Sequence, residues 1–215
     1  MIVLSTEKRV NDLQAALLAV DRSRVRAIFQ EGVQADGALP FMEGIVGIVL
    51  DRIGDAWQTG RLALSHVYMA GRICEELSLS ILPEGHSDRK DDPSIALAVF
   101  EDHHILGKQL VHAVLRNDGF RVQDLGRVNL QQVLERVRTG TVDVLLLSCL
   151  MLSSALRMGR LCEAIKTENL RVKVIVGGAP FRFDPQLWRE VGADSMGYTA
   201  SQSPSLVRSV SQDRV

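Results

Sequence analysis

The stretch "EDHHILGK", residues 101–108, follows directly on the apolar run 94–100 and holds side chains that could bind a metal. Asp102, His104 and Gly107 form the pattern D-x-H-x-x-G. A neutral imidazole is a good donor to a transition metal, and a carboxylate beside it can fix its tautomer. An isolated histidine at a strand end more often has a structural role, so a role in metal binding needs support from other parts of the sequence.

Two further short patterns follow later apolar runs. Ser148 and Leu150 form S-x-L after the run 142–148, and Gly177-Gly178 ends the run 171–177. Glycine permits close approach of backbone or ligand, although a glycine pair alone more often marks a turn. The chain has no G-x-G-x-x-G, no P-loop lysine and no G-x-S-x-G, which argues against a phosphate-binding loop or a nucleophile elbow.

The segments that carry these patterns alternate in type after residue 94. Candidate strands are the apolar runs 95–100, 120–124, 142–148, 171–177 and 195–198. Helical stretches separate them at about 105–117, 129–138, 154–167 and 185–191. This alternation predicts a parallel five-stranded sheet of the Rossmann-like (flavodoxin-like) type, covered on both faces. Ligands of such sheets bind at the carboxyl ends of the strands, where all three patterns lie.

The first part of the chain has a different periodicity. Apolar residues recur at helical spacing through residues 1–82, which predicts a bundle of four to five helices, with turns at Gly32, Gly37 and Gly60. Residues 83–93 are polar and bounded by prolines, so we expect a linker there. The α/β domain is then expected over 94–215.

Composition narrows the classes of partner and compartment. The chain has 215 residues, 46% of them hydrophobic and 24% charged, and a net charge of −1, which gives no basic face for nucleic acid. No signal peptide or membrane-length apolar stretch is present, so we expect a cytoplasmic protein without membrane contact. The three cysteines form no C-x-x-C pair, which argues against disulfides or structural zinc. The pair His103-His104 lacks further ligands at zinc spacing.

Taken together and in this order, the three patterns resemble the cobalamin-binding domain of methionine synthase, corrinoid methyl carriers and cobalamin-dependent mutases, over about residues 94–210. The resemblance implies that His104 is the lower axial ligand of cobalt, replacing the cofactor's own nucleotide base. It makes Asp102 the hydrogen-bond acceptor of the imidazole and Ser154 the third member of the relay. Glu101 stands where relatives often have glycine. The other residues that the resemblance implies for cofactor binding, chiefly along a slot for the displaced nucleotide tail, are Gly107, Ser148, Leu150, Gly177 and Gly178, with Gly126 as an addition.

The stretch "IGDAWQTGRLALSHVYMAG", residues 53–71, resembles the helical cap of the same family. It implies that Trp57, with Leu64 or His66, contacts the upper face of the corrin ring. A lone tryptophan in a bundle is also commonly a core residue. Val67-Tyr68 stands where light-sensing relatives tend to carry Glu-His, which favours a small methyl group as the upper ligand over adenosyl. The form H-x-L-G at residues 104–107 resembles sensors more than methyl carriers, so the two features point in opposite directions.

The resemblance therefore predicts a corrinoid methyl-carrier protein that binds methylcobalamin, cob(I)alamin or a related corrinoid. Its expected partners are a methyl-donor-specific methyltransferase, an acceptor methyltransferase and a reductive activase, and the apolar bundle faces leave a homodimer open. No acid, base or substrate pocket is identified, so the chain is expected to be a non-catalytic methyl-carrying subunit. The alternative is a cobalamin sensor or storage module with no methyl-transfer role.

Overall fold

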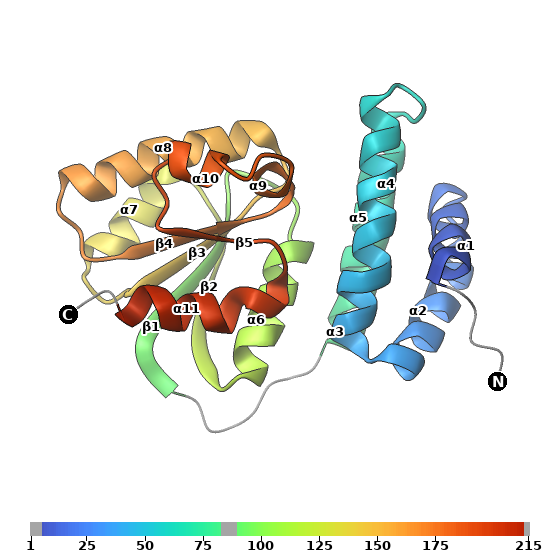
Figure 1. Cartoon of the computed structure of the whole chain (residues 1–215), viewed down its shortest axis with the longest axis horizontal. Coiled ribbons are helices and arrows are strands. Elements are labelled where there is room, and N and C mark those ends of the chain that lie inside the picture. The colour runs from blue at the N-terminus through green and yellow to red at the C-terminus, as the bar shows by residue number, and fades with distance from the viewer. Residues whose placement is uncertain (1–5, 83–89, 213–215) are drawn as a thin grey trace. The chain divides into compact units, whose positions relative to one another are not determined.

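The computed structural model describes residues 6–82 and 90–212, which belong to two compact units, Met1–Pro83 and Glu84–Val215 (Figure 1). Of the expected linker over 83–93, residues 83–89 lie outside the described residues. Residues 90–93 already belong to the first strand, because β1 spans Lys90–Phe100 and begins five residues before the expected start.

The first unit is helical, as predicted. Its elements are α1 (Thr6–Leu18), α2 (Arg22–Asp36), α3 (Ala38–Phe41), the π-helical turn η1 (Met42–Val46), α4 (Gly47–Gln58) and α5 (Leu64–Ile81). The elements α3, η1 and α4 form one continuous helical segment, since the residues at their junctions have helical backbone dihedrals. Their buried apolar residues form the core of the unit, including Val10, Leu13, Leu17, Val25, Phe29, Phe41, Val49 and Ile53.

Two of the three turns predicted at glycines of this unit are present in the structure. Gly37 and Gly60 have φ values of +88° and +72° and follow α2 and α4. The expected turn at Gly32 is wrong, because this residue is buried inside α2. An ideal Cβ there would lie 2.3 Å from the ring of Phe41, so the glycine makes room for an aromatic side chain rather than for a bend.

The second unit is a parallel five-stranded sheet in the order β2-β1-β3-β4-β5, which confirms the predicted flavodoxin-like architecture. Besides β1, the strands are β2 (Phe120–Val128), β3 (Val144–Ser148), β4 (Lys173–Gly177) and β5 (Ser195–Gly197). The helices are α6 (Leu106–Asn117), α7 (Leu130–Arg138), α8 (Leu152–Thr167), α9 (Ala179–Phe183), α10 (Leu187–Glu190), the 3-10 turn η2 (Ala200–Gln202) and α11 (Ser203–Gln212). The sequence did not predict α9 or α11.

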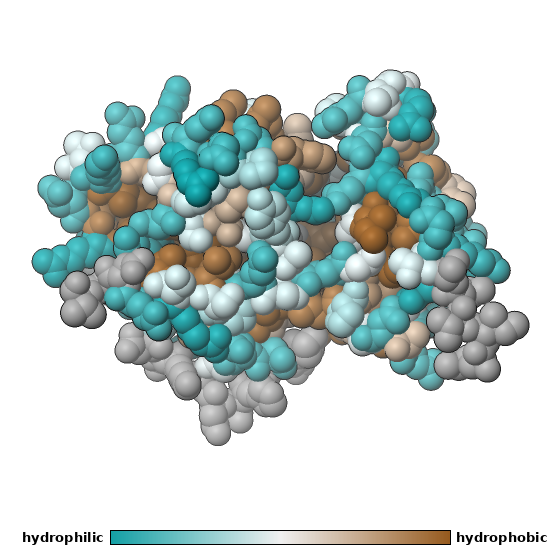
Figure 2. All heavy atoms as spheres, in the orientation of Figure 1, coloured by the Kyte–Doolittle hydropathy of each residue, from teal (hydrophilic) through white to brown (hydrophobic). Residues whose placement is uncertain are grey.

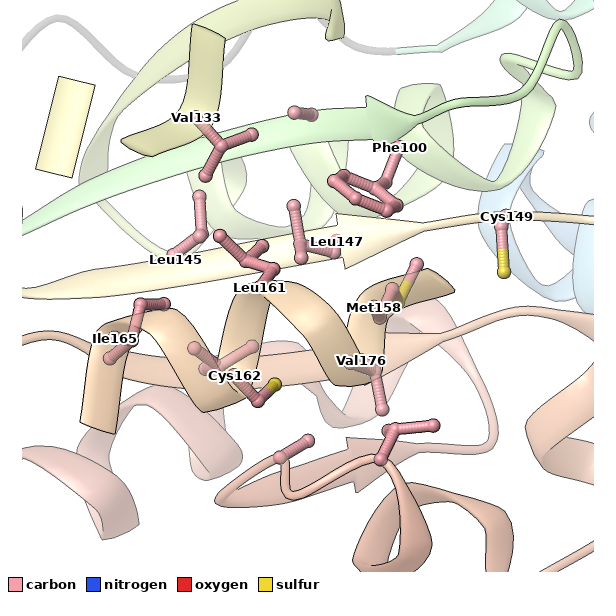
Figure 3. Close-up of a cluster of buried hydrophobic side chains, with 14 of the residues drawn as sticks. Phe100, Val133, Leu145, Leu147, Cys149, Met158, Leu161, Cys162, Ile165 and Val176 are labelled. Carbon is pink, nitrogen blue, oxygen red and sulfur yellow. The ribbon is translucent and has the colours of Figure 1, made fainter. Parts of the chain in front are cut away.

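Alternate residues of the central strand β3 pack on opposite faces of the sheet. Leu145 and Leu147 contact the cluster that includes Met158, Leu161 and Ile165 of α8, which Figure 3 shows lying along the sheet. The intervening residues, Val144 and Leu146, belong to a second cluster with residues of α6 and α11. Because every residue of β3 is buried, its continuous apolar sequence fits a strand covered on both sides.

Hydrophilic residues dominate the face seen in Figure 2, with hydrophobic residues in separate areas, one of them over α4 and α5. Large exposed apolar residues on these two helices are Ile48, Trp57, Leu64 and Tyr68. Within residues 6–82 and 90–212, no helix combines the length and the hydropathy needed to cross a membrane.

Candidate functional site

The carboxylate of Asp102 joins two loops at the carboxyl edge of the sheet. Its Oδ1 accepts hydrogen bonds from the backbone N–H groups of His103 and His104, at 2.6 and 3.1 Å, and from the imidazole Nδ1 of His104, at 2.7 Å. Its Oδ2 accepts from the backbone N–H groups of Leu150 and Met151, both at 2.8 Å. The loop after β1 is therefore tied to the loop after β3 through one buried side chain.

These hydrogen bonds decide the ionisation of Asp102 and the tautomer of His104. Burial alone would raise the pKa of Asp102, but the bonds from the His104 imidazole and from the N–H groups of Met151, Leu150 and His104 hold it well below its usual range. An ionised carboxylate can only accept, so the proton of the imidazole lies on Nδ1. The other nitrogen, Nε2, has no hydrogen-bond partner in the part of the chain that the structure describes. The side chain of His104 is 30% exposed.

Small residues lie at the carboxyl ends of β3 and β4 and at the start of α6. An ideal Cβ on Gly107, in the first turn of α6, would lie 3.0 Å from Oγ of Ser148. Ser148 ends β3 and pairs in register with Gly177 at the end of β4. The next residue, Gly178, has φ of +122°, and an ideal Cβ there would lie 1.8 Å from the carbonyl oxygen of Cys149. A side chain at Gly178 would collide with the backbone of Cys149, and one at Gly107 would crowd the Ser148 hydroxyl.

The loop after β3 presents apolar side chains as well as backbone donors. Leu150 donates its N–H to Asp102, and the residue as a whole is 37% exposed. Exposed apolar residues continue from it into α8, at Met151, Leu152 and Leu156. The sequence did not single out Met151, since a backbone donor leaves no signature in residue type.

Ser154 lies near Asp102 but makes a different contact from the one that the relay would need. Its side chain is buried in α8, and its hydroxyl donates to the backbone carbonyl of Glu101 at 2.7 Å. The oxygens of Asp102 are meanwhile occupied by N–H donors of the two loops. Gly126 lies at a bulge within β2 and not at its end, and its N–H donates to Asp124.

The candidate residues of the helical unit lie around the connection between α4 and α5. Trp57 is 38% exposed and Leu64 is 58% exposed, so the alternative of Trp57 as a core residue is wrong. His66 is half-buried, and its Nδ1 has no hydrogen-bond partner in the described parts of the chain. The end of this helix pair thus presents an apolar surface.

A doubly wound sheet with a carboxylate-supported imidazole at its carboxyl edge, where ligands of such sheets bind, indicates a ligand-binding domain. The chain belongs to the B12-binding family: residues 94–207 match the B12 binding domain, and residues 9–78 match a second type of B12 binding domain. Its cofactor is accordingly cobalamin or a related corrinoid.

Curated relatives align along almost the whole chain. The chain is 28% identical over 207 residues to dimethylamine corrinoid protein 1 of Methanosarcina acetivorans, covering 93% of this chain and 96% of the relative. It is 32% identical over 161 residues to dimethylamine corrinoid protein 3 of Methanosarcina mazei, covering 72% and 95%. Its fold matches the solved monomethylamine corrinoid protein of Methanosarcina barkeri with a TM-score of 0.77 at 24% identity, over 96% of this chain and all of that one.

Proposed function

We propose that this protein is a corrinoid methyl carrier. It holds cobalamin with His104 as the lower axial ligand, in place of the cofactor's own nucleotide base, and carries a methyl group between partner methyltransferases. The observation that carries this proposal is the Asp102–His104 pair, whose hydrogen bond of 2.7 Å leaves Nε2 free at the carboxyl edge of the sheet. The names of the relatives, dimethylamine corrinoid proteins, support the methyl-transfer context.

The residues present fit the cofactor. A neutral imidazole whose Nδ1 proton is held by a carboxylate is a more basic ligand and keeps one orientation. We infer that the displaced nucleotide tail lies near Gly107, Ser148 and Gly178, because these residues have small side chains or none. When bound, the corrinoid supplies a cobalt centre that accepts and releases a methyl group.

The chain itself has the tasks of holding and shielding. Asp102 keeps the imidazole oriented, and Leu150 and Met151 fix the loop that carries the exposed apolar side chains. We assign the shielding of the upper face to Trp57 and Leu64 of the helical unit, because both are exposed and apolar. The methyl donor and acceptor sites then belong to separate methyltransferases, and a reductive activase restores the reduced cofactor.

The test of ligation is reconstitution of the purified protein with cobalamin, followed by reduction to the cob(II) state. Its electron paramagnetic resonance spectrum should show splitting by one axial nitrogen. This splitting should change from the 14N to the 15N pattern when the protein contains 15N-labelled histidine. His104→Ala should abolish the change, while His103→Ala, the matched control, should keep it. A spectrum insensitive to the label in the wild-type protein would refute ligation by His104.

The carrier role needs a separate test. The holoprotein reduced to the cob(I) state should take up a methyl group from methyl iodide, used as the probe, with release of iodide. It should pass this methyl group to an acceptor in the presence of a methyltransferase encoded nearby. A holoprotein that takes up no methyl group, but binds adenosylcobalamin tightly and changes its assembly in light, would favour the sensor alternative.

A further inference from the structure

Glu101, the residue between β1 and Asp102, has a backbone conformation that is unusual for its type. Its φ is +46°, in the left-handed region, where a residue with a Cβ is disfavoured and glycine is not. Such a residue persists only when its surroundings hold it, and these conformations gather at functional sites. The contacts of Glu101 therefore show what fixes the exit of the chain from β1.

The side chain of Glu101 is held by two helices. Its carboxylate forms an ion pair with Nε of Arg157 on α8, and it accepts a hydrogen bond of 3.3 Å from the N–H of Leu130. Leu130 is the first residue of α7, where N–H groups lack partners within the helix and favour a negative charge.

The backbone of Glu101 is held on both sides as well. Its N–H donates to the carbonyl of Val128 at 2.8 Å, and its carbonyl accepts from Oγ of Ser154 at 2.7 Å. Nη2 of Arg157 lies 3.3 Å from the same carbonyl and 3.3 Å from Oγ of Ser154. Arg157 thus bonds the side chain and the main chain of Glu101 together. We call Glu101, Ser154 and Arg157 the Glu101 clamp.

We propose that Glu101 and Arg157 are positioning residues for the His104 ligand. This inference rests on the proposed function, because it assumes that His104 binds cobalt. Residue 101 sets the direction in which the chain leaves β1, and Asp102 and His104 follow within three residues. A single exposed ion pair would contribute little, and Arg157 is 41% exposed. Its effect on the site comes instead from holding a backbone conformation that Glu101 disfavours.

This mechanism makes a specific prediction about glycine. Removal of the guanidinium in Arg157→Ala releases Glu101 from the left-handed conformation and lets His104 move away from the metal. Glycine reaches the same φ without a clamp. The double variant Glu101→Gly/Arg157→Ala should therefore recover the ligation of cobalt by His104 that Arg157→Ala loses, although it lacks both partners of the ion pair.

The measurement is the ratio of His-ligated to unligated cobalt in cob(II)alamin bound to the full chain, from the axial nitrogen splitting. Arg157→Ala should lower this ratio about tenfold. Arg157→Lys should lower it less, since lysine keeps the charge but not the forked geometry. The double variant should return to within about twofold of the wild type. Arg138→Ala is the matched control, because Arg138 is 43% exposed and pairs with Glu168 at 2.6 Å at the other end of α8.

Two results would overturn the inference. One is an unchanged ratio in Arg157→Ala and Arg157→Lys, even if urea unfolding shows reduced stability, because the clamp would then be structural only. The other is a double variant as poorly ligated as Arg157→Ala. In both cases the wild type still shows ligation that His104→Ala removes. A wild type without such ligation would instead refute the proposed function, and the inference with it.

Discussion

The backbone of Gly178 passes so close to that of Cys149 that an ideal Cβ at position 178 would lie 1.8 Å from the Cys149 carbonyl oxygen. The N–H of Cys149 donates to the carbonyl of Gly177 at 3.2 Å, so the chains leaving β3 and β4 stay in contact past the ends of the strands. This contact holds the two chain segments together at the carboxyl edge of the sheet. It depends on a glycine for two reasons, space and the φ of +122°.

Gly178→Ala should therefore lower the free energy of unfolding by about 3 kcal/mol or more, since the clash is with backbone and cannot be relieved by a rotamer change. Urea unfolding followed by circular dichroism measures the loss. Gly140→Ala is the control: Gly140 also has positive φ, +68°, but nothing lies within 4 Å of its Cβ position. The free energy of unfolding of the control should fall by only about 1–2 kcal/mol. Equal losses in the two variants would contradict the role given to the Cys149 contact.

Asp102→Asn should destabilise the α/β unit even without the cofactor. An amide keeps the shape of the side chain, but its NH₂ group would face N–H donors that now bond to a carboxylate oxygen. Loss of charge-assisted, buried hydrogen bonds should lower the free energy of unfolding by about 3 kcal/mol. Urea unfolding of the apoprotein at neutral pH measures this. Apoprotein as stable as the wild type would show that Asp102 does not tie the two loops together.

The ion pair of Asp124 with Lys108 should make stability depend on pH in the acid range. Burial raises the pKa of Asp124. This rise is outweighed by the hydrogen bonds from Lys108 and from the N–H of Gly126, and by the charges of Lys108 and His112, so the pKa lies below its ordinary value. A lowered pKa in the folded state stabilises the protein above the unfolded pKa of about 3.9, and this contribution is lost as the pH falls through the folded pKa.

The wild type should therefore lose more free energy of unfolding than Asp124→Asn when the pH falls from about 5 to below about 4. Urea unfolding at a series of pH values measures both curves. Glu31→Gln, a change of an exposed carboxylate on α2, is the control and should follow the wild type. Parallel curves for the wild type and Asp124→Asn would contradict the linkage.

The three cysteines should be inert in the folded protein. Burial raises the pKa of the thiols of Cys74, Cys149 and Cys162 to about 12, so the reactive thiolate is scarce at neutral pH. Iodoacetamide at pH 8 should label them slowly in buffer and rapidly in urea, as mass spectrometry would show. Rapid labelling of Cys149 in buffer would mean that the end of β3 opens more readily than its burial implies.

The alternation of short apolar runs and amphipathic stretches determined the architecture of the second unit from sequence alone. It did so because a parallel strand needs a covering helix before the next strand. The boundaries were less accurate. The first strand begins at Lys90 rather than near residue 95, since Lys90 pairs with Phe120 although its neighbours are polar. The short α9 and the final α11 were missed, because proline and serine at their starts suggest loops.

The spacing of Asp102 and His104 sufficed to predict their association, since two residues in one loop can meet without help from the rest of the fold. The direction of the Ser154 hydroxyl, the left-handed conformation of Glu101 and the position of Arg157 could not be predicted in this way. They depend on how α7 and α8 pack against the ends of β1 and β3, which brings together residues 29 to 56 positions apart. The sequence by itself determined which chemical groups the edge of the sheet carries. Only the tertiary structure decided how these groups are held, because hydrogen bonds from separate helices leave no periodic signal in the chain.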